Sequence, residues 1–407
     1  MESAFSFLVN TRALLRAVRH IKHYIPAREK ACVKKSVWLS VENGRLCVEL
    51  NAEARIAQFL PVEKLFVVKP HPVAVEAELF IKVLSRCPEE VHINFSDSTF
   101  RVMTANTVIA LPYIGPEWFA SVAGSPVPSS AAGLAKIVDA VAEVLPSASM
   151  DADNTDLHCV HFSLSPGVLR VEALNGHMYQ CVHIELDAST SAVAFALNGV
   201  MLPYPYAKRL IDTIKSGFLG DGLTVSVGIL GRWSELHIYG QCGSMSLPLY
   251  RREYPNTYVF LQRRKAVEGR ITVKAKDVVS ALGMMLPSMG ACDRGVYFSI
   301  LAGDLCLVTR SECGTNTAYI TQFKAVGKLP IPLSVPAEQL MGLIARVSEP
   351  GDEILLELTR SEGPCFISSG SKPESLGIIM PLKVEYCELP EGVSKPARAE
   401  SDQKKVA

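Results

Sequence analysis

Apolar residues recur at helical spacing in three segments of the chain, and each segment ends in proline. The segments are LLRAVRHIKHYIP from Leu14 to Pro26, LAKIVDAVAEVLP from Leu134 to Pro146, and AKDVVSALGMMLP from Ala275 to Pro287. Within each segment the apolar residues lie mainly at i, i+3 or i+4, which places them on one face of a helix. The pattern therefore predicts the same amphipathic helix in three copies, with its apolar face in a core.

A second pattern follows each helix, in which apolar positions alternate on both sides of a glycine. It reads VWLSVENGRLCV from Val37, VHFSLSPGVLRV from Val160 and VYFSILAGDLCL from Val296. Alternation is typical of half-buried strands, and the glycine shared by the three copies permits a tight turn. The sequence thus predicts a β-hairpin after each helix.

Each copy continues with a second helical stretch and closes on a strand that carries Leu-Pro or Met-Pro. The helical stretches are Leu79 to Arg86, Lys208 to Lys215 and Leu340 to Val347, and the closing pairs are Leu111-Pro112, Leu247-Pro248 and Met380-Pro381. Copies separated by roughly 120 to 140 residues are domains rather than stacked solenoid turns. We expect domain 1 over 1–122, domain 2 over 123–257, domain 3 over 258–384 and a mobile tail over 385–407.

Strands outnumber helices within each copy, and their connections are mostly short. This favours α+β domains, each with two helices and antiparallel sheets, over a doubly wound parallel sheet. Such sheets leave edge strands, and pairing between the edges of similar domains hides them. If that pairing is head to tail and the rotation closes, three similar tandem domains assemble into a ring.

The repeated order of helix, hairpin, helix and closing strand resembles the β subunit of bacterial DNA polymerase III, the β sliding clamp, from about Ser6 to Val384. The most specific local matches are Asn175-Gly176-His177, Tyr254-Pro255-Asn256 before Val259-Phe260-Leu261, and the closing segment Ile378 to Leu382. The family usually has Asp-Gly-His-Arg, Phe-Pro-Asp-Tyr and a Val-Met-Pro-Met type of ending. Because of these departures, and because the chain continues past the family's usual C-terminus, it resembles a divergent member of the family.

The resemblance implies a homodimer whose two subunits join head to tail into a ring around duplex DNA, with helices inside and sheets outside. It implies a processivity factor rather than an enzyme, with no cofactor or metal. A clamp loader opens such a ring, and the DNA polymerase III catalytic subunit and other proteins with clamp-binding motifs dock through short peptides at the junction of domains 2 and 3. The matching pocket residues are Leu157, Leu174, Gly176, His177, Met178, Tyr179, Pro255, Val259, Phe260, Ile378, Ile379, Met380, Pro381 and Leu382.

Charge is balanced over the chain, with 41 lysines and arginines against 41 aspartates and glutamates. DNA binding therefore requires cations that are sorted onto one surface. On the first helix Arg12, Arg16, Arg19 and His23 form one stripe opposite the apolar face. Such a stripe alone is more typical of a solvated helix face, but the resemblance favours contact with phosphates. The residues expected to contact DNA are Arg12, Arg16, Arg19, Arg28, Lys82, Arg86, Lys136, Lys208, Arg209 and Lys215.

The composition, with 48% hydrophobic and 20% charged residues, is that of a folded chain. The eleven cysteines include no CxxC pair, and neither a signal peptide nor a membrane-spanning run is evident. We expect reduced thiols and a cytoplasmic location.

Two constellations suggest chemistry other than binding. His158, Cys159 and His161 are zinc-ligand types, but residues three apart on a strand point to opposite faces, so a shared ion is not expected. His177 and Cys181 suggest a nucleophile pair, yet no orienting residue accompanies them. Glycine-rich phosphate loops are missing from the sequence. The alternatives to a sliding clamp are a clamp paralogue that sequesters clamp-binding partners without sliding and, from another class, a Cys/His hydrolase.

Overall fold

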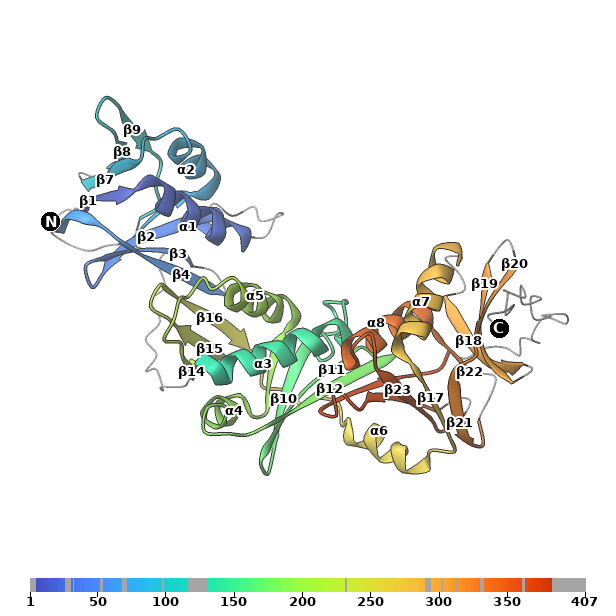
Figure 1. Cartoon of the computed structure of the whole chain (residues 1–407). Helices are drawn as coiled ribbons and strands as arrows, with labels where there is room; N and C mark the ends of the chain where they lie inside the picture. Colours follow the sequence, from blue (N-terminus) through green and yellow to red (C-terminus); the bar gives the residue numbers. More distant parts are fainter. Residues whose placement is uncertain are drawn as a thin grey trace, which may run out of the picture. The chain divides into compact units, whose positions relative to one another are not determined.

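The computed structural model describes residues 5–25, 31, 33–51, 54–67, 72–96, 99–115, 131–230, 233–289, 294–301, 303–311, 314–329, 333–360 and 363–382 (Figure 1). The chain divides into two compact units. Unit 1 comprises Met1–Asn175 and Val182–Pro255, and unit 2 comprises Gly176–Cys181 and Asn256–Ala407. Unit 1 thus holds the first two sequence repeats and unit 2 the third, while the exact boundaries of three domains remain a prediction.

Unit 1 contains three groups of antiparallel strands. The first sheet has the order β5 (Glu63–Val67), β1 (Phe5–Asn10), β7 (Glu90–Ser96), β8 (Thr99–Met103) and β9 (Val108–Leu111). The second has the order β14 (Thr224–Leu230), β15 (Trp233–Tyr239), β16 (Gly243–Leu249), β4 (Arg55–Pro61), β3 (Arg45–Asn51), β2 (Ser36–Glu42) and β6 (Val73–Glu76). The third contains β13 (Val200–Pro203), β10 (Cys159–Ser165), β11 (Val168–Leu174) and β12 (Met178–Glu185), of which Met178–Cys181 belong to unit 2.

The helices of unit 1 form two pairs. α1 (Thr11–His23) packs against α2 (Ala77–Leu84), and α3 (Ala131–Val144) packs against α5 (Tyr204–Lys215). The short helix α4 (Ser191–Leu197) lies between β12 and β13 in the chain. It has no counterpart among the described residues of the other repeats, and the search for repeated patterns did not predict it.

Unit 2 repeats the same plan. One group of strands has the order β25 (Ser375–Ile379), β24 (Cys365–Ser369), β23 (Glu353–Leu358), β17 (Gly269–Lys274) and β21 (Phe323–Gly327). A second sheet has the order β20 (Gly314–Ile320), β19 (Asp304–Ser311), β18 (Gly295–Leu301) and β22 (Leu333–Pro336). The helices are α6 (Tyr258–Gln262), α7 (Ala275–Met285) and α8 (Ala337–Val347), and α7 packs against α8.

The predicted α+β class and the repeated helices and hairpins are confirmed. The three hairpins pair in equivalent registers, with Leu39 opposite Val48, Phe162 opposite Val171 and Phe298 opposite Leu307. Their turn glycines have φ angles of 74°, 77° and 86°, a conformation that glycine adopts without strain.

Two boundaries differ from the predictions. α1 begins at Thr11 rather than Leu14, because the side chain of Asn10 accepts a hydrogen bond from the backbone N–H of Ala13 at 3.0 Å and caps the helix there. At the other end of the chain β25 stops at Ile379, so the Met380-Pro381 pair follows the closing strand rather than lying in it.

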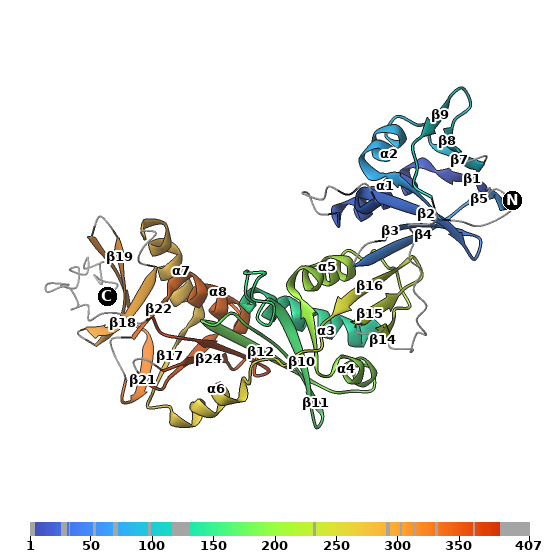
Figure 2. The same ribbon diagram turned by 180° about the vertical axis from the view of Figure 1, so that it is seen from behind.

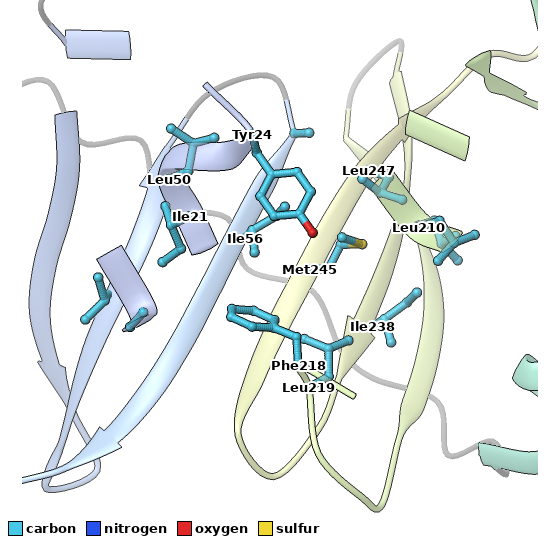
Figure 3. Close-up of a cluster of buried hydrophobic side chains, with 14 of the residues drawn as sticks. Ile21, Tyr24, Leu50, Ile56, Leu210, Phe218, Leu219, Ile238, Met245 and Leu247 are labelled. Carbon is cyan, nitrogen blue, oxygen red and sulfur yellow. The ribbon is translucent and has the colours of Figure 1, made fainter. Parts of the chain in front are cut away.

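The first two repeats share one core. Figure 3 shows Ile21, Tyr24 and Ile56 from the first repeat facing Phe218 and Met245 from the second, and all five belong to one cluster of buried side chains. β4 and β16 lie side by side in both views (Figures 1 and 2) and pair from Gln58 opposite Gly243 to Arg55 opposite Ser246. Strand pairing and apolar burial therefore hold the two repeats together as one unit.

Polar contacts fix this junction further. The buried hydroxyls of Tyr24 and Thr213 lie 2.8 Å apart, and the ring of His20 stacks on Phe218 with centroids 3.9 Å apart. Arg209 donates from Nη2 to the carbonyl oxygen of Tyr24 at 2.8 Å. Because α1 and α5 carry most of these groups, the contacts set the position of one helix relative to the other.

The junction can be tested at Gly243, where an added Cβ atom would lie 2.3 Å from the carbonyl oxygen of Ala57 on β4. We expect Gly243→Ala to lower the free energy of unfolding of unit 1 by about 1–3 kcal/mol, because the strands must move apart. Urea unfolding followed by tryptophan fluorescence measures this, since the three tryptophans of the chain all precede residue 256.

The matched control is Ser244→Ala, which changes the neighbouring half-buried residue of the same strand without adding an atom. Its free energy of unfolding should stay within about 0.5 kcal/mol of the wild type. Equal unfolding midpoints for the two variants would contradict the close approach of β16 to β4.

Candidate functional sites

The predicted arginine stripe lies on the exposed face of α1. Arg12, Arg16 and Arg19 are exposed, and together with Leu15 and His20 they line a surface depression. The opposite face of the helix is buried in the core of unit 1. α1 contains no acidic residue, so no carboxylate of the helix itself lies among the three guanidinium groups.

The second helix of the first repeat adds further positive charge. Lys82 is exposed on α2, and Arg86 is exposed in the turn that follows it. An ion pair of 2.9 Å between Lys22 and Glu78 joins α1 to α2. Arg28 lies outside the described residues.

The cations predicted in the second repeat are mostly engaged by protein groups. Lys136 pairs with Asp187 at 2.6 Å, and this hydrogen bond is the main reason that the pKa of the Asp187 carboxyl lies well below its usual range. Lys215 lies 3.8 Å from Asp139, while Lys208 is exposed. Positive charge is therefore less available here than on α1.

Arg209 contacts other groups of the protein rather than extending into solvent alone. Besides its hydrogen bond to Tyr24, its guanidinium lies 5.8 Å from the ring centroid of Tyr24 and 5.6 Å from that of Tyr206. Cation–π contacts of this kind stabilise a buried junction. The geometry thus gives Arg209 a role in joining the two repeats, which its sequence position did not reveal.

The two histidines of the suspected metal constellation have separate partners. Nδ1 of His158 donates to the carbonyl of Ser149 at 2.7 Å, whereas Nδ1 of His161 lies 2.8 Å from Oε1 of the buried Glu172. Burial raises the pKa of the Cys159 thiol to about 12, so the thiol stays protonated. Among the described residues, no group of three potential ligands is arranged to hold a metal ion.

The second suspected constellation also differs from a catalytic pair. Cys181 is fully buried, while His177 is exposed. A buried sulfur is inaccessible to a substrate, so this geometry favours a structural role for Cys181.

The predicted peptide pocket draws residues from both units. In unit 2 the backbone N–H of Met380 donates to the carbonyl of His177 at 2.8 Å, so the closing segment lies next to the Gly176–Cys181 strand. Met178 and Tyr179 are buried, and Met178 belongs to the core cluster of unit 2. The sequence favoured a surface role for these two residues, but their burial is that of core side chains.

Other predicted pocket residues of unit 2 remain accessible. Val259 on α6 is 48% exposed, and Gly176 and His177 are also exposed. The partly exposed residues are Phe260, Met380, Pro381 and Leu382. Ile378 and Ile379 are buried in β25. The accessible set is mostly apolar, as a surface that binds a hydrophobic peptide side chain requires.

In unit 1, Leu157 and Pro255 are half-buried and Leu174 is buried. The sequence did not single out Tyr258, which is 58% exposed beside Val259 on α6. Its only sequence signal was its place between the Tyr254-Pro255-Asn256 motif and Val259.

The three helix pairs and their hairpin-containing sheets define the sliding-clamp fold. The structure is similar to the DNA polymerase III β subunit of Pseudomonas aeruginosa, with a TM-score of 0.78 at 15% identity over 93% of this chain and 100% of that chain. A putative β subunit from Eubacterium rectale gives a TM-score of 0.78 at 14% identity over 93% and 99% of the two chains. The sliding clamp of Bartonella birtlesii, solved bound to griselimycin, gives 0.77 at 16% identity over 94% and 100%.

No protein-family model matches the sequence, and no curated protein matches it. The likeness therefore lies in the fold, at a sequence identity typical of divergent chains. In the described part of the chain, no helix combines the length and the apolar character needed to cross a membrane.

Proposed function

We propose that the chain is a DNA sliding clamp, a processivity factor that encircles duplex DNA and tethers a replicative polymerase and other replication or repair proteins. The observation that carries the proposal is the exposed arginine stripe of α1 in a molecule with the sliding-clamp fold. The proposed activity is binding without catalysis.

The stripe suits a protein that slides. Arginines that contact phosphates attract DNA without reading its sequence, so the protein can move along the duplex. The chain as a whole has a formal net charge of zero, which keeps attraction to DNA local to the sorted surface. Because Lys136 and Lys215 have acidic partners, we expect the first repeat to supply most of the attraction.

Encirclement requires that the ends of two chains meet. The first and third repeats each offer a sheet edge and an exposed apolar group. In the first repeat β9 is an edge strand that carries Val108, 60% exposed. In the third repeat β20 is an edge strand, and α7 carries Met284, 73% exposed. The two ends differ, so a head-to-tail contact between two copies satisfies both at once. We propose a homodimer in which domain 1 of one copy pairs with domain 3 of the other.

Partners would dock through short peptides with large apolar anchors. The accessible apolar residues of unit 2, among them Val259, Phe260 and Met380, supply contact area for such anchors. We propose the DNA polymerase III catalytic subunit, the clamp loader and other proteins with clamp-binding motifs as the partners.

Reversing the charge of the stripe should weaken DNA retention. For the triple variant Arg12→Glu, Arg16→Glu, Arg19→Glu we expect the salt dependence of DNA affinity to lose about 0.9 in slope for each phosphate contact removed. The unfolding midpoint should change little, because the three side chains are exposed. Affinity measured by fluorescence anisotropy at several salt concentrations gives the slope.

The control reverses three exposed lysines of unit 2, in the variant Lys265→Glu, Lys324→Glu, Lys328→Glu. It produces the same change in net charge away from α1. Equal losses in the two triple variants would argue against a specific DNA surface on α1.

The ring can be tested by the mass in solution. We expect a species of twice the chain mass of 44.3 kDa, and a shift towards the monomer in Val108→Asp, because a charge would be buried in the interface. Phe195→Asp on α4, where Phe195 is 66% exposed against 60% for Val108, is the control and should remain dimeric. A wild type that is strictly monomeric at micromolar concentration would instead favour a clamp paralogue that sequesters partners.

The peptide site can be tested with a Gln-Leu-x-Leu-Phe type peptide. We expect Met380→Ala to weaken its binding by about 1–2 kcal/mol in calorimetry, as truncation of an interface anchor does. Val326→Ala removes an exposed apolar group from β21 and should leave the affinity unchanged. Binding that is insensitive to Met380→Ala would move the site elsewhere on the chain.

A further inference from the structure

The seven-stranded sheet of unit 1 has a hollow on the face that points away from its core. Val48, Ile56 and Met245 alternate onto the core face, where α1 packs on β3 and β4. Their neighbours in sequence point to the other face, where Ala57 lies directly opposite Ser244 across β4 and β16. Larger side chains surround these two small ones, which leaves a cavity of about 170 Å³.

Two carboxylates line this cavity, and one of them has a buried oxygen without a hydrogen-bond partner. Glu49 lies beside Ala57 in the same cross-strand row, and its Oε1 atom is buried without a hydrogen-bond partner. Glu42 also lines the cavity and is exposed. Buried carboxylate oxygens are normally hydrogen-bonded, so Oε1 of Glu49 indicates an occupant that donates hydrogen bonds.

The other groups around the cavity do not neutralise these acids. Among the described lining residues Arg55 is the one permanent cation. Burial lowers the pKa of His237, so its imidazole is neutral at pH 7, and burial raises the pKa of Tyr239, so its hydroxyl stays protonated. Cys47 is likewise protonated, since burial raises the pKa of its thiol. Above pH 7, where Glu49 is mostly ionised, the two carboxylates therefore outnumber the one positive charge.

The ionisation of the Glu49 carboxyl should depend on whether a cation is bound nearby. Burial first, and then the charge of Glu42, raise its pKa to about 7, while Arg55 opposes this shift. A bound cation favours the ionised carboxylate, so it would lower the pKa of Glu49. Affinity for a cation should consequently rise as the pH increases through 7.

We propose that this cavity binds a guanidinium group. Guanidinium is planar, carries five N–H donors and pairs with carboxylate oxygens, which suits the unpartnered Oε1 of Glu49 and the nearby carboxylate of Glu42. The aromatic rings of Phe59 and Tyr239 line the same cavity, and guanidinium stacks on such rings. The site lies on the opposite side of the sheet from α1, so its occupation does not compete with DNA bound to the arginine stripe.

Ligand-observed NMR titration of the full chain tests the proposal with two matched pairs of probes. Propylguanidinium is compared with propylurea, its neutral isostere. A blocked glycine-rich pentapeptide with one arginine is compared with the same peptide containing citrulline. In each pair we expect the cationic member to bind at least about tenfold more tightly, as a charge-assisted contact with a buried carboxylate requires.

Glu49→Gln should weaken the binding of both cationic probes by about tenfold and remove its rise between pH 6 and pH 8. Glu63→Gln, which changes an exposed glutamate of β5, should leave both properties unchanged. Tighter binding of the arginine peptide than of propylguanidinium would identify a protein side chain as the occupant, and the reverse order would identify a free small molecule.

Equal affinity for the charged and neutral members of each pair would overturn the proposal, as would no binding of either cation to the wild type. Because the probe pairs are compared on the unaltered chain, this result does not depend on whether Glu49→Gln folds normally.

Discussion

Unit 1 depends on the pairing of β4 with β16, because each repeat alone would leave one of these strands as an open edge. An unpaired edge exposes a row of backbone donors and acceptors, which water or another chain must satisfy. Here the backbone donors and acceptors of β4 and β16 pair with one another, from Gln58 opposite Gly243 to Arg55 opposite Ser246. The close approach at Gly243 leaves no room for a side chain, so the pairing requires glycine at this position. The continuous core beneath the sheet then follows from this pairing.

The same junction decides which cations remain available for a partner. Arg209 lies against Tyr24 and Tyr206, and its charge is directed to a backbone carbonyl rather than to solvent. The arginines of α1 remain exposed. A chain without net charge can therefore present a positive surface, because tertiary contacts engage some cations and leave the arginines of α1 exposed.

Local patterns were sufficient to predict the repeated elements, because helix faces, alternating strands and turn glycines leave direct marks in the sequence. Boundaries were less predictable: α1 begins earlier than expected because Asn10 caps it, and α4 was missed because it occurs in one repeat only. In the candidate sites, helical spacing alone placed Arg12, Arg16 and Arg19 on one surface. The burial of Met178 depends on packing within unit 2, which no local pattern records.

The cavity at Glu49 was unpredictable for the same reason. One cross-strand row of its lining residues runs from Glu49 to Ala57 and on to Ser244 and Tyr239. This row joins strands from two repeats. In the sequence these residues read as ordinary alternating positions of separate strands. Only the pairing of β4 with β16 brings small residues together at the centre and an acid to their side. One constraint thus gives the shared sheet two different faces: an apolar face that supports α1 with its arginines, and an opposite face where Glu42 and Glu49 line a hollow. The two proposed sites consequently lie on opposite sides of one sheet, so DNA and a guanidinium group would not compete for the same surface.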